Sequence, residues 1–411
     1  MFESLTHFAA LDWAKDHHDV VILQPNGRIV ADFRLPHTAA GWQLWREKIA
    51  AYPKLGVALE TSFGATAEQL IDSGVMVYPI HPKQSSAYRQ RQCPSDNKTD
   101  HVDAWALADA LRMDGHAWRP LEPTDPIIAQ LRVLCRDEVA LIEERTALVN
   151  QLQQALLEYY PTALEAFEDW TLESAWAFVQ RFPTTQVLLK AGKRQWEKFL
   201  HSHGLYRPQT YQKRLDIFAN AGQWKLSEPL VAAKSLYAVV RCRQLSLLQA
   251  QLQEYRKSIE ALFASHPDSA LFGSLPGAGP KLAPRLLSEI GSQRSLYEDA
   301  QALQCLAGTA PVSFQSGKLR KANMRHSCNK NLRHAMHLFA NLSRATCSWA
   351  QIYYEGLKKR GKTHVQALRN LGQRWLKIIW KMWQTRTLYD GELHLKNQLA
   401  HGSWVLQVVA Q

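Results

Sequence analysis

The sequence predicts an α/β domain at the N-terminus, a long helical arm in the middle and a mainly helical domain at the C-terminus. Short β-branched runs separated by turn signals fill the first 35 residues or so. From Asp125 onward, apolar residues recur at helical intervals over roughly 30 residues with few helix breakers. Beyond residue 269 the helical pattern resumes around a glycine-rich turn. We therefore place the domains at residues 1–120, 121–268 and 269–411.

The N-terminal elements follow an α/β order with a hairpin at the front. The predicted strands "HFAALDWA", "HDVVILQ" and "RIVADFRL" include the strong turn signal Asn26-Gly27 before the third strand. A helix is predicted over residues 39–51, where large apolar residues have helical spacing. Two further strands, "LGVALE" and "GVMVYPIHP", bracket the helical "TAEQLIDSG", and another helix is predicted in "NKTDHVDAWALADAL".

The arm is predicted from its two long helical stretches. Pro126 suits the first turn of a helix and Pro161 ends the run, which gives a helix about 50 Å long. This length exceeds what one domain core needs, so we expect it to pair with a second long helix over residues 227–265 in a coiled-coil-like arrangement. Residues 161–224 between them are helical and rich in Trp and Phe, and carry no recognisable chemistry.

The third region opens with "SLPGAGPKLAPRLLSEIG", a glycine turn between two predicted helices. Gly277 and Gly279 permit close backbone approach, and amides near a helix N-terminus can bind phosphate. Lys281 suits a phosphate contact, whereas Pro284 is unusual inside a helix and is expected to kink it. The pattern predicts a helix-hairpin-helix that grips the DNA backbone, and a plain tight helical turn is the alternative.

The positive charge is concentrated in one segment. The chain has a net charge of +12, and residues 317–383 carry 15 Lys and Arg against the single acid Glu355, so the remainder sums to −2. Such a basic block with interleaved aromatic residues suits phosphate neutralisation with stacking or apolar backing, and a merely solvated surface is the alternative. The aromatic residues are Trp349, Tyr353, Tyr354, Trp375, Trp380 and Trp383. The Trp/Leu stripe in "LGQRWLKIIWKMW" is more typical of a core face.

The composition disfavours secretion and membrane spanning. The six cysteines are scattered without metal-binding spacing, which fits a reducing compartment. The N-terminus lacks the pattern of a signal peptide, and no run of eighteen apolar residues occurs. We expect a cytoplasmic protein that does not contact membranes.

Four acidic residues stand where a metal site is expected. Asp12 and Glu60 end two predicted strands, and a carboxylate there is costly to bury unless it is paired or metal-bound. Asp100 and Asp103 lie one helical turn apart and share a face. Alone, that pair is typical of a solvated first helical turn; together, the four acids can hold Mg²⁺ for phosphoryl transfer. We discount acids expected in turns or on the wrong side of their elements, and a His pair expected on the surface: Asp16, Asp19, Asp96, Asp109, His17 and His18.

The order of a strand Asp, a strand Glu and a helix with paired Asp resembles the RuvC-like RNase H fold. More narrowly, "ALDWAKDHHDVVIL", "ALETSFG", "HPKQSSAYRQ" and "KTDHVDAWALADAL" resemble the DEDD-type transposases of the IS110 family, which are related to Piv-type DNA invertases. The segment from residue 274 is similar to the opening of that family's C-terminal transposase domain. The resemblance covers about residues 7–115 and 270–345, and it implies that Asp12, Glu60, Asp100 and Asp103 bind the metal.

A serine is the second catalytic candidate. In "GTAPVSFQSGKLRKANMR" a Ser-Gly pair precedes several cations, but a serine hydroxyl is a weak nucleophile and the pattern alone is more typical of a plain turn. The family resemblance implies a catalytic serine here, which we place on Ser316 with Ser313 as the fallback. The cations expected to contact nucleic acid are Lys318, Arg320, Lys321 and Arg325.

The resemblance implies a recombinase that moves an insertion sequence by cutting and rejoining double-stranded donor and target DNA. It also implies guidance by an element-encoded bridge RNA and assembly into a homo-oligomer, a dimer or a tetramer. Two other functions fit the residues. A RuvC-like nuclease would use the same acids with water as the nucleophile, and a non-enzymatic nucleic-acid-binding protein would use the acids only structurally.

Overall fold

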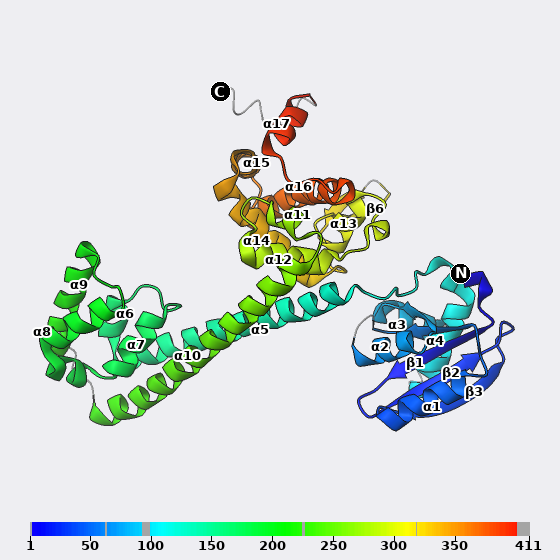
Figure 1. The fold of residues 1–411 in the computed structure, drawn as a ribbon, viewed down its shortest axis with the longest axis horizontal. Helices are drawn as coiled ribbons and strands as arrows, with labels where there is room; N and C mark the ends of the chain where they lie inside the picture. The colour runs from blue at the N-terminus through cyan, green and yellow to red at the C-terminus, as the bar shows by residue number, and fades with distance from the viewer. Residues whose placement is uncertain (1, 62–63, 93–98, 224–226, 318, 401–411) are drawn as a thin grey trace. The chain divides into compact units, whose positions relative to one another are not determined.

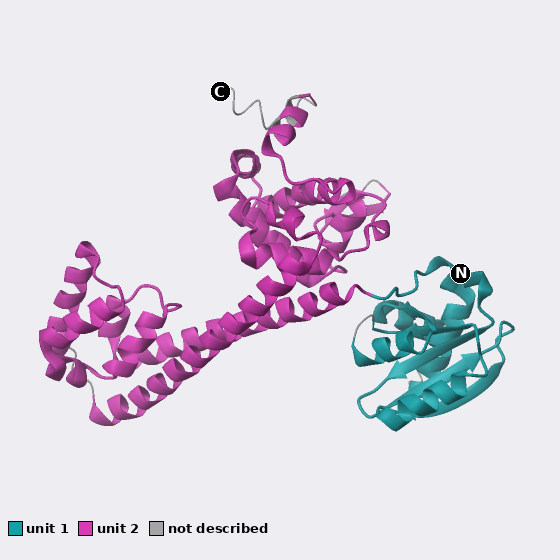
Figure 2. Ribbon diagram, in the orientation of Figure 1, with its two compact units in different colours: residues 1–123 teal, residues 124–411 magenta. Residues whose placement is uncertain are grey.

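The computed structural model describes residues 2–61, 64–92, 99–223, 227–317 and 319–400. The chain divides into two compact units, residues 1–123 and 124–411 (Figure 2). The arm and the C-terminal domain, which we expected as separate domains, share the second unit. Among the described residues, no helix has both the length and the apolar character needed to cross a membrane.

The first unit is built on a five-stranded sheet with the order β3-β2-β1-β4-β5. Strand β2 is antiparallel to β1 and β3, and β4 is parallel to β1 and β5. This arrangement follows from the sequence. Short turns connect β1 to β2 and β2 to β3, which lets these strands run antiparallel, while a helix precedes each of the parallel strands β4 and β5. The strands are β1 His7–Trp13, β2 His17–Leu23, β3 Ile29–Pro36, β4 Leu55–Leu59 and β5 Met76–Pro79.

Helices cover both faces of this sheet (Figure 1). Side chains of α1 and α2 pack with one face of the sheet, and small and branched side chains of α4 pack with the other. Alternate residues of β1 divide between the two cores, Ala9 and Leu11 in the first and Phe8 and Ala10 in the second. The helices are α1 Ala39–Ile49, α2 Ala65–Asp72, α3 Pro82–Gln92 and α4 Asp100–Asp114, with short 3-10 turns at Phe2–Ser4 and Gly115–Ala117.

Two features of this unit differ from expectation. Helix α3 has no predicted counterpart, because its sequence "PKQSSAYRQRQ" is polar and lacks apolar periodicity. The pair His17 and His18 opens β2 rather than lying in a surface turn. His18 is fully buried and its ring donates to or accepts from His37 at 2.9 Å, so its expected surface position is wrong.

The arm of the second unit is an antiparallel pair of long helices, α5 Pro126–Tyr159 and α10 Glu228–Ser265. Ile128 and Ile259 belong to one hydrophobic core, while Leu156 and Ala238 belong to another at the opposite end of the pair. The second core is rich in Trp and Phe and is completed by α6 Pro161–Ala166, α7 Glu173–Arg181, α8 Thr185–Ser202 and α9 Pro208–Ala219, followed by a 3-10 turn at Ala221–Gln223.

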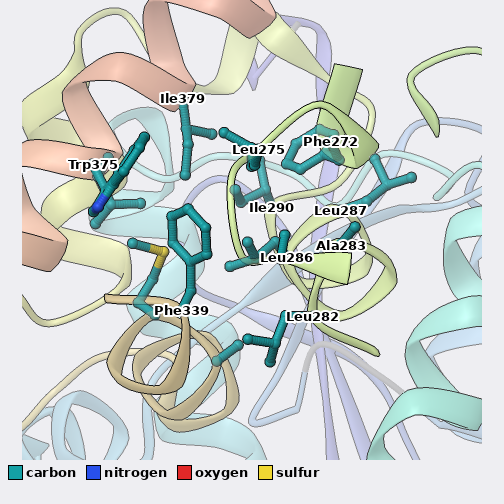
Figure 3. Packing of buried hydrophobic residues seen from close by; sticks show 14 of the residues in the cluster. Phe272, Leu275, Leu282, Ala283, Leu286, Leu287, Ile290, Phe339, Trp375 and Ile379 are labelled. Carbon is teal, nitrogen blue, oxygen red and sulfur yellow. The ribbon is translucent and has the colours of Figure 1, made fainter. Parts of the chain in front are cut away.

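The C-terminal part of this unit packs around α12, α14 and α16. Figure 3 shows side chains of α12, among them Leu286, beside Phe339 of α14 and Ile379 of α16. Trp375 and Trp383 are fully buried, so they belong to the core beneath the surface and their rings cannot stack on nucleic-acid bases. The elements are α11 Ser269–Gly273, α12 Gly279–Ile290, a 3-10 turn Arg294–Leu296, α13 Ala300–Leu306, β6 Val312–Ser316, β7 Leu319–Asn323, α14 Lys330–Thr346, α15 Ser348–Lys359, α16 His364–Thr385 and α17 Gly391–Ala400.

Buried ion pairs join the arm to this part. The carboxylate of Glu138 in α5 accepts from Arg256 of α10 at 3.1 Å and from Arg285 of α12 at 2.7 Å. Glu289 of α12 accepts from Arg136 of α5 at 2.7 Å and from the Asn329 side chain at 2.7 Å. Both glutamates are nearly fully buried, and a buried carboxylate that loses its partner is strongly destabilising. The base of the arm is therefore fixed to α12.

Candidate acidic and nucleophilic sites

The first candidate site lies at the ends of β1 and β4 in the first unit. Leu11 pairs with Leu59 across these parallel strands, so Asp12 and Glu60 are the next residues of neighbouring strands. Both continue the alternation that places Ala10 and Ala58 in the core beneath α4. The two carboxylates therefore share the face of the sheet that α4 covers.

Helix α4 brings the second pair of acids to this face. The Thr99 hydroxyl accepts from the Val102 amide at 3.2 Å and starts the helix directly before Asp100. Asp103 is buried and lies on the same helical face as Ala104 and Leu107, which pack on the sheet. Asp100 is exposed at the edge of the same face.

The pKa of Asp12 is raised by its surroundings, which include the other predicted acids. Burial raises this pKa most, and the negative charges of Asp103, Glu60, Asp100 and Asp19 raise it further, to about 7. The three other predicted acids thus all act electrostatically on Asp12. This crowding of carboxylates is the arrangement that a divalent cation would relieve.

Helix α3 supplies a partner to two of the acids. Ser85, itself buried, donates its hydroxyl to Glu60 in a short hydrogen bond. One helical turn later, Arg89 donates from Nη1 to both oxygens of Asp103, at 3.1 and 3.2 Å. Tyr88 between them donates to Asp114 of α4 at 2.7 Å, which holds α3 against α4. We did not identify Ser85 or Arg89 from the sequence, because nothing in it shows which acids α3 faces.

Asp19 also belongs to this face, which corrects our discounting of it. It lies in β2 opposite Asp12, and Arg34 donates to its two oxygens at 3.2 and 3.3 Å. Side-chain ligand atoms of His17, Asp19 and Asp100 all lie within 4.8 Å of one another. These three residues and the four predicted acids therefore form one continuous set of potential ligands that share Asp100.

The other discounted acids lie elsewhere. Asp16 is exposed in the bend between β1 and β2. Asp109 is buried in α4, where it accepts from Arg112 at 2.6 Å. Asp96 lies outside the described residues.

The second candidate site is a β-hairpin in the second unit. Ser316 is the last residue of β6, exposed, and pairs with Leu319 of β7. Gly317 has a φ of 55°, which allows the tight turn. Ser313 is also exposed but lies three positions earlier, so it points to the opposite face of the hairpin.

Only some of the expected cations can be placed. Lys321 is exposed and pairs with Phe314, on the face of the hairpin that carries Ser316. Arg325 is partly buried and follows β7. Lys318 lies outside the described residues, as does the side chain of Arg320.

The glycine turn before α12 has two different glycines. Gly277 has a φ of 81°, and a Cβ there would meet the Leu342 carbonyl of α14 at 3.2 Å, so its close approach serves packing within the chain. Gly279 has a φ of 56° with open space around it, and Lys281 is exposed. Helix α11 before the turn has only 5 residues. Helix α12 continues through the buried Pro284.

Comparisons with known proteins match both candidate sites. A family model described as a transposase, of the IS110 DEDD type, matches residues 9–161, and one for the IS116/IS110/IS902 transposase family matches residues 269–355. The "Mini-circle putative transposase for IS117" of Streptomyces coelicolor is 32% identical over 94% of this chain and 96% of its own length. The "Insertion element IS110 uncharacterized 43.6 kDa protein" of the same species is 28% identical over 97% of this chain and 99% of its own. A DEDD family implies a divalent metal, which the crowded carboxylates fit.

Substitution of Asp12 tests the repulsion among the acids. The folded protein holds the Asp12 proton up to a pH of about 7, whereas an ordinary aspartate releases it near 3.8, so stability falls as pH rises between these values. We expect Asp12→Asn to raise the metal-free stability at pH 8 by on the order of 1 kcal/mol and to reduce the gain on adding a divalent ion. Thermal unfolding with and without metal measures both, and Asp16→Asn is the control. Equal stability of Asp12→Asn and wild type at pH 8 would contradict the repulsion.

Substitution of Arg89 tests whether its guanidinium competes with a cation for Asp103. We expect Arg89→Ala to lower the metal-free stability by about 1–3 kcal/mol, because Asp103 loses its partner. The stabilisation on adding a divalent ion should then exceed that of wild type. Arg91→Ala, an exposed position of α3, is the matched control. A metal-induced gain no larger than in wild type would show that Arg89 does not compete.

Proposed function

The chain belongs to the IS116/IS110/IS902 family of transposases, and on that premise we propose that it is a metal-dependent DNA recombinase with a serine nucleophile. Transposases of insertion elements are DNA strand-transfer enzymes. The observation that carries the proposal is the joint action of Asp103, Glu60 and Asp100 on Asp12 at the ends of β1 and β4. We propose that the first unit has a RuvC-like fold, which the order of strand Asp, strand Glu and helical Asp pair supports.

We assign Asp12, Glu60, Asp100 and Asp103 as the residues that hold Mg²⁺. All four offer hard oxygen ligands, which suit this ion. Bound there, Mg²⁺ supplies charge stabilisation for the scissile phosphate. The roles of the protein side chains are distinct: Ser85 orients the Glu60 carboxylate, and Arg89 balances the charge of Asp103.

We assign the attack to Ser316. In this step the Ser316 Oγ forms a bond to phosphorus while a phosphorus–oxygen bond to the deoxyribose breaks, and the hydroxyl proton passes to a base or to water. The product is a covalent phosphoserine link that a second strand end can resolve. The exposed position of Ser316 at the hairpin end, with Lys321 on the same face, supports this role.

The partners follow from the same premise. The segment of net charge +14 suits the phosphates of donor and target DNA. An element-encoded bridge RNA would pair with both DNAs and choose the sites. The enzyme would act in the bacterial cytoplasm, where chromosomal DNA lies.

We propose that the arm joins copies of the chain. Leu236, Val240 and Leu247 of α10 lie on one stripe by helical spacing and are 69%, 41% and 63% exposed. A stripe of this kind on a long helix suits packing against the same stripe of a second copy. Two copies at least are needed, since two duplexes must be cut and rejoined.

A water-dependent nuclease is the alternative for the same acids. Each candidate site lies in a different unit, and the acids need no serine to activate water.

Ser316→Ala distinguishes these two functions. We expect it to abolish the covalent protein–DNA adduct that wild type forms on element-end DNA with Mg²⁺, because the only proposed nucleophile is gone. Ser313→Ala should keep the adduct, and Asp12→Asn should lose cleavage altogether. Denaturing gel electrophoresis of labelled DNA measures the adduct. An adduct that persists in Ser316→Ala would refute the role of this serine, and strand cleavage without any adduct would favour water.

Charged substitutions in the exposed stripe of α10 test whether the arm joins copies of the chain. We expect Leu236→Glu with Leu247→Glu to reduce the oligomer to a monomer, because like charges would meet across the interface. Ser246→Glu with Gln253→Glu adds the same charge to exposed positions of α10 that lie on a different face of the helix, and should leave the oligomer intact. Light scattering gives the mass. An unchanged mass of the double leucine variant would exclude this stripe as the interface.

A further inference from the structure

A cavity of about 260 Å³ lies between α14 and α16 in the second unit. Its floor is apolar and includes Met336 and Leu368, both buried. Its rim consists of Lys, Arg and His residues, and none of the described residues that line it is acidic. The rim residues are Lys330, Arg333, His334, His337 and Arg369.

The two arginines of the rim are not neutralised by the protein. Arg333 donates from Nη2 to the carbonyl of Arg325, and its buried Nε has no hydrogen-bond partner. Arg369 donates to the sulfur of Met324 at 3.0 Å. Over the described part of the chain, neither guanidinium forms an ion pair with a carboxylate. Burial lowers the pKa of His337, and the neighbouring basic groups His364, His334 and Arg369 lower it further, so basic side chains gather here. An anion is the natural counterpart.

A glycine keeps the cavity open. Gly372 lies inside α16, where glycine costs roughly 0.5–1 kcal/mol relative to alanine. Packing does not require it, because a Cβ at this position would meet its nearest atoms, in Met336 and Thr309, only at 3.8 Å. Its lack of a side chain instead leaves space in the cavity that it lines.

The cavity adjoins a polar one that reaches the hairpin of Ser316. This second cavity, also about 260 Å³, shares Thr309 and Arg369 with the first and has Arg325 and Lys362 in its wall. It is also lined by Pro311 and Ala322, at the base of the hairpin. A nucleic-acid strand that lies along these cations would pass from the apolar cavity toward Ser316.

We propose that the cavity between α14 and α16 takes up one unpaired nucleotide, with its base against Met336 and Leu368 and its phosphate at Arg333 and Arg369. A nucleotide unit combines the two properties that the cavity demands, a flat base that gains by leaving water and an anionic phosphate. The volume is just below the range of sites for drug-sized ligands, which suits one nucleotide. Enzymes that hold an unpaired base in this way gain selectivity from the low cost of extruding it. The inference rests on the proposed nucleic-acid binding by this unit.

The test uses the full chain and a hairpin duplex with a one-nucleotide bulge, made as DNA and as RNA. Each is compared with the same duplex carrying an abasic bulge and with a duplex without a bulge. We expect wild type to bind the intact bulge about tenfold more tightly than the abasic one. The nucleic acid that shows this difference identifies the source of the nucleotide. Equal affinity for intact and abasic bulges would overturn the pocket, whereas no binding to any duplex would overturn the proposed function itself.

Variants of Gly372 localise the effect. Gly372→Leu should fill the cavity and remove the preference for the intact bulge, while affinity for the unbulged duplex stays as in wild type. Gly372→Ala, which adds only a tolerated methyl group, controls for the change in the helix and should be as stable as wild type or more so. If Gly372→Leu does not fold, Val365→Trp at the exposed rim replaces it. A folded variant that keeps the preference would overturn the assignment to this cavity.

Discussion

Repulsion among carboxylates at the end of β1 is the constraint that organises the first unit. Burial of Asp12 raises the pKa of its carboxyl most, and the four acids around it raise that pKa further. Neighbouring elements supply partners to three of these acids. Ser85 holds Glu60, Arg89 holds Asp103, and Arg34 of β3 holds Asp19. In the described part of the chain, three of the four acids around Asp12 thus have a protein partner, while Asp12 lies among acids. Without a bound cation, these crowded carboxylates lower the free energy of unfolding of the protein.

The sequence predicted the acids because their positions depend on local rules. A carboxylate that ends an apolar strand, as Asp12 and Glu60 do, is conspicuous, and i and i+3 spacing places Asp100 beside Asp103 in any helix. Their partners follow no such rule. Helix α3 has no apolar periodicity, and Ser85 meets Glu60 only because the fold brings together residues 25 positions apart. Asp19 was discounted for a related reason: it lies in a predicted strand, but the pairing that places it opposite Asp12 depends on the register of β1 and β2, which the sequence does not show.

In the second unit, too, the features that depend on neighbouring residues could be predicted from the sequence, and those that depend on distant residues could not. Pro126 and Pro161 mark the ends of the first arm helix in the sequence as well as in the structure, since proline suits the first turn of a helix and disfavours its interior. The ion pairs of Glu138 join residues 118 and 147 positions apart, which no periodic pattern can reveal. The basic segment could be assigned to nucleic acid from its charge, but the aromatic residues within it divide by burial. Trp375 and Trp383 form core, and that outcome depends on which face of α16 meets α14.

The arm leaves the core that contains Ile128 and returns to the same core at Ile259. Most of the chain between these residues therefore leaves that core and returns to it, and it carries its own aromatic core at the far end. Equal numbers of turns removed from α5 and α10, about seven residues from each for two turns, would shift that far core along the arm axis and leave both cores whole. The length of the arm can consequently change by paired insertions or deletions in α5 and α10. Neither the candidate catalytic residues nor the two cores need to change with it.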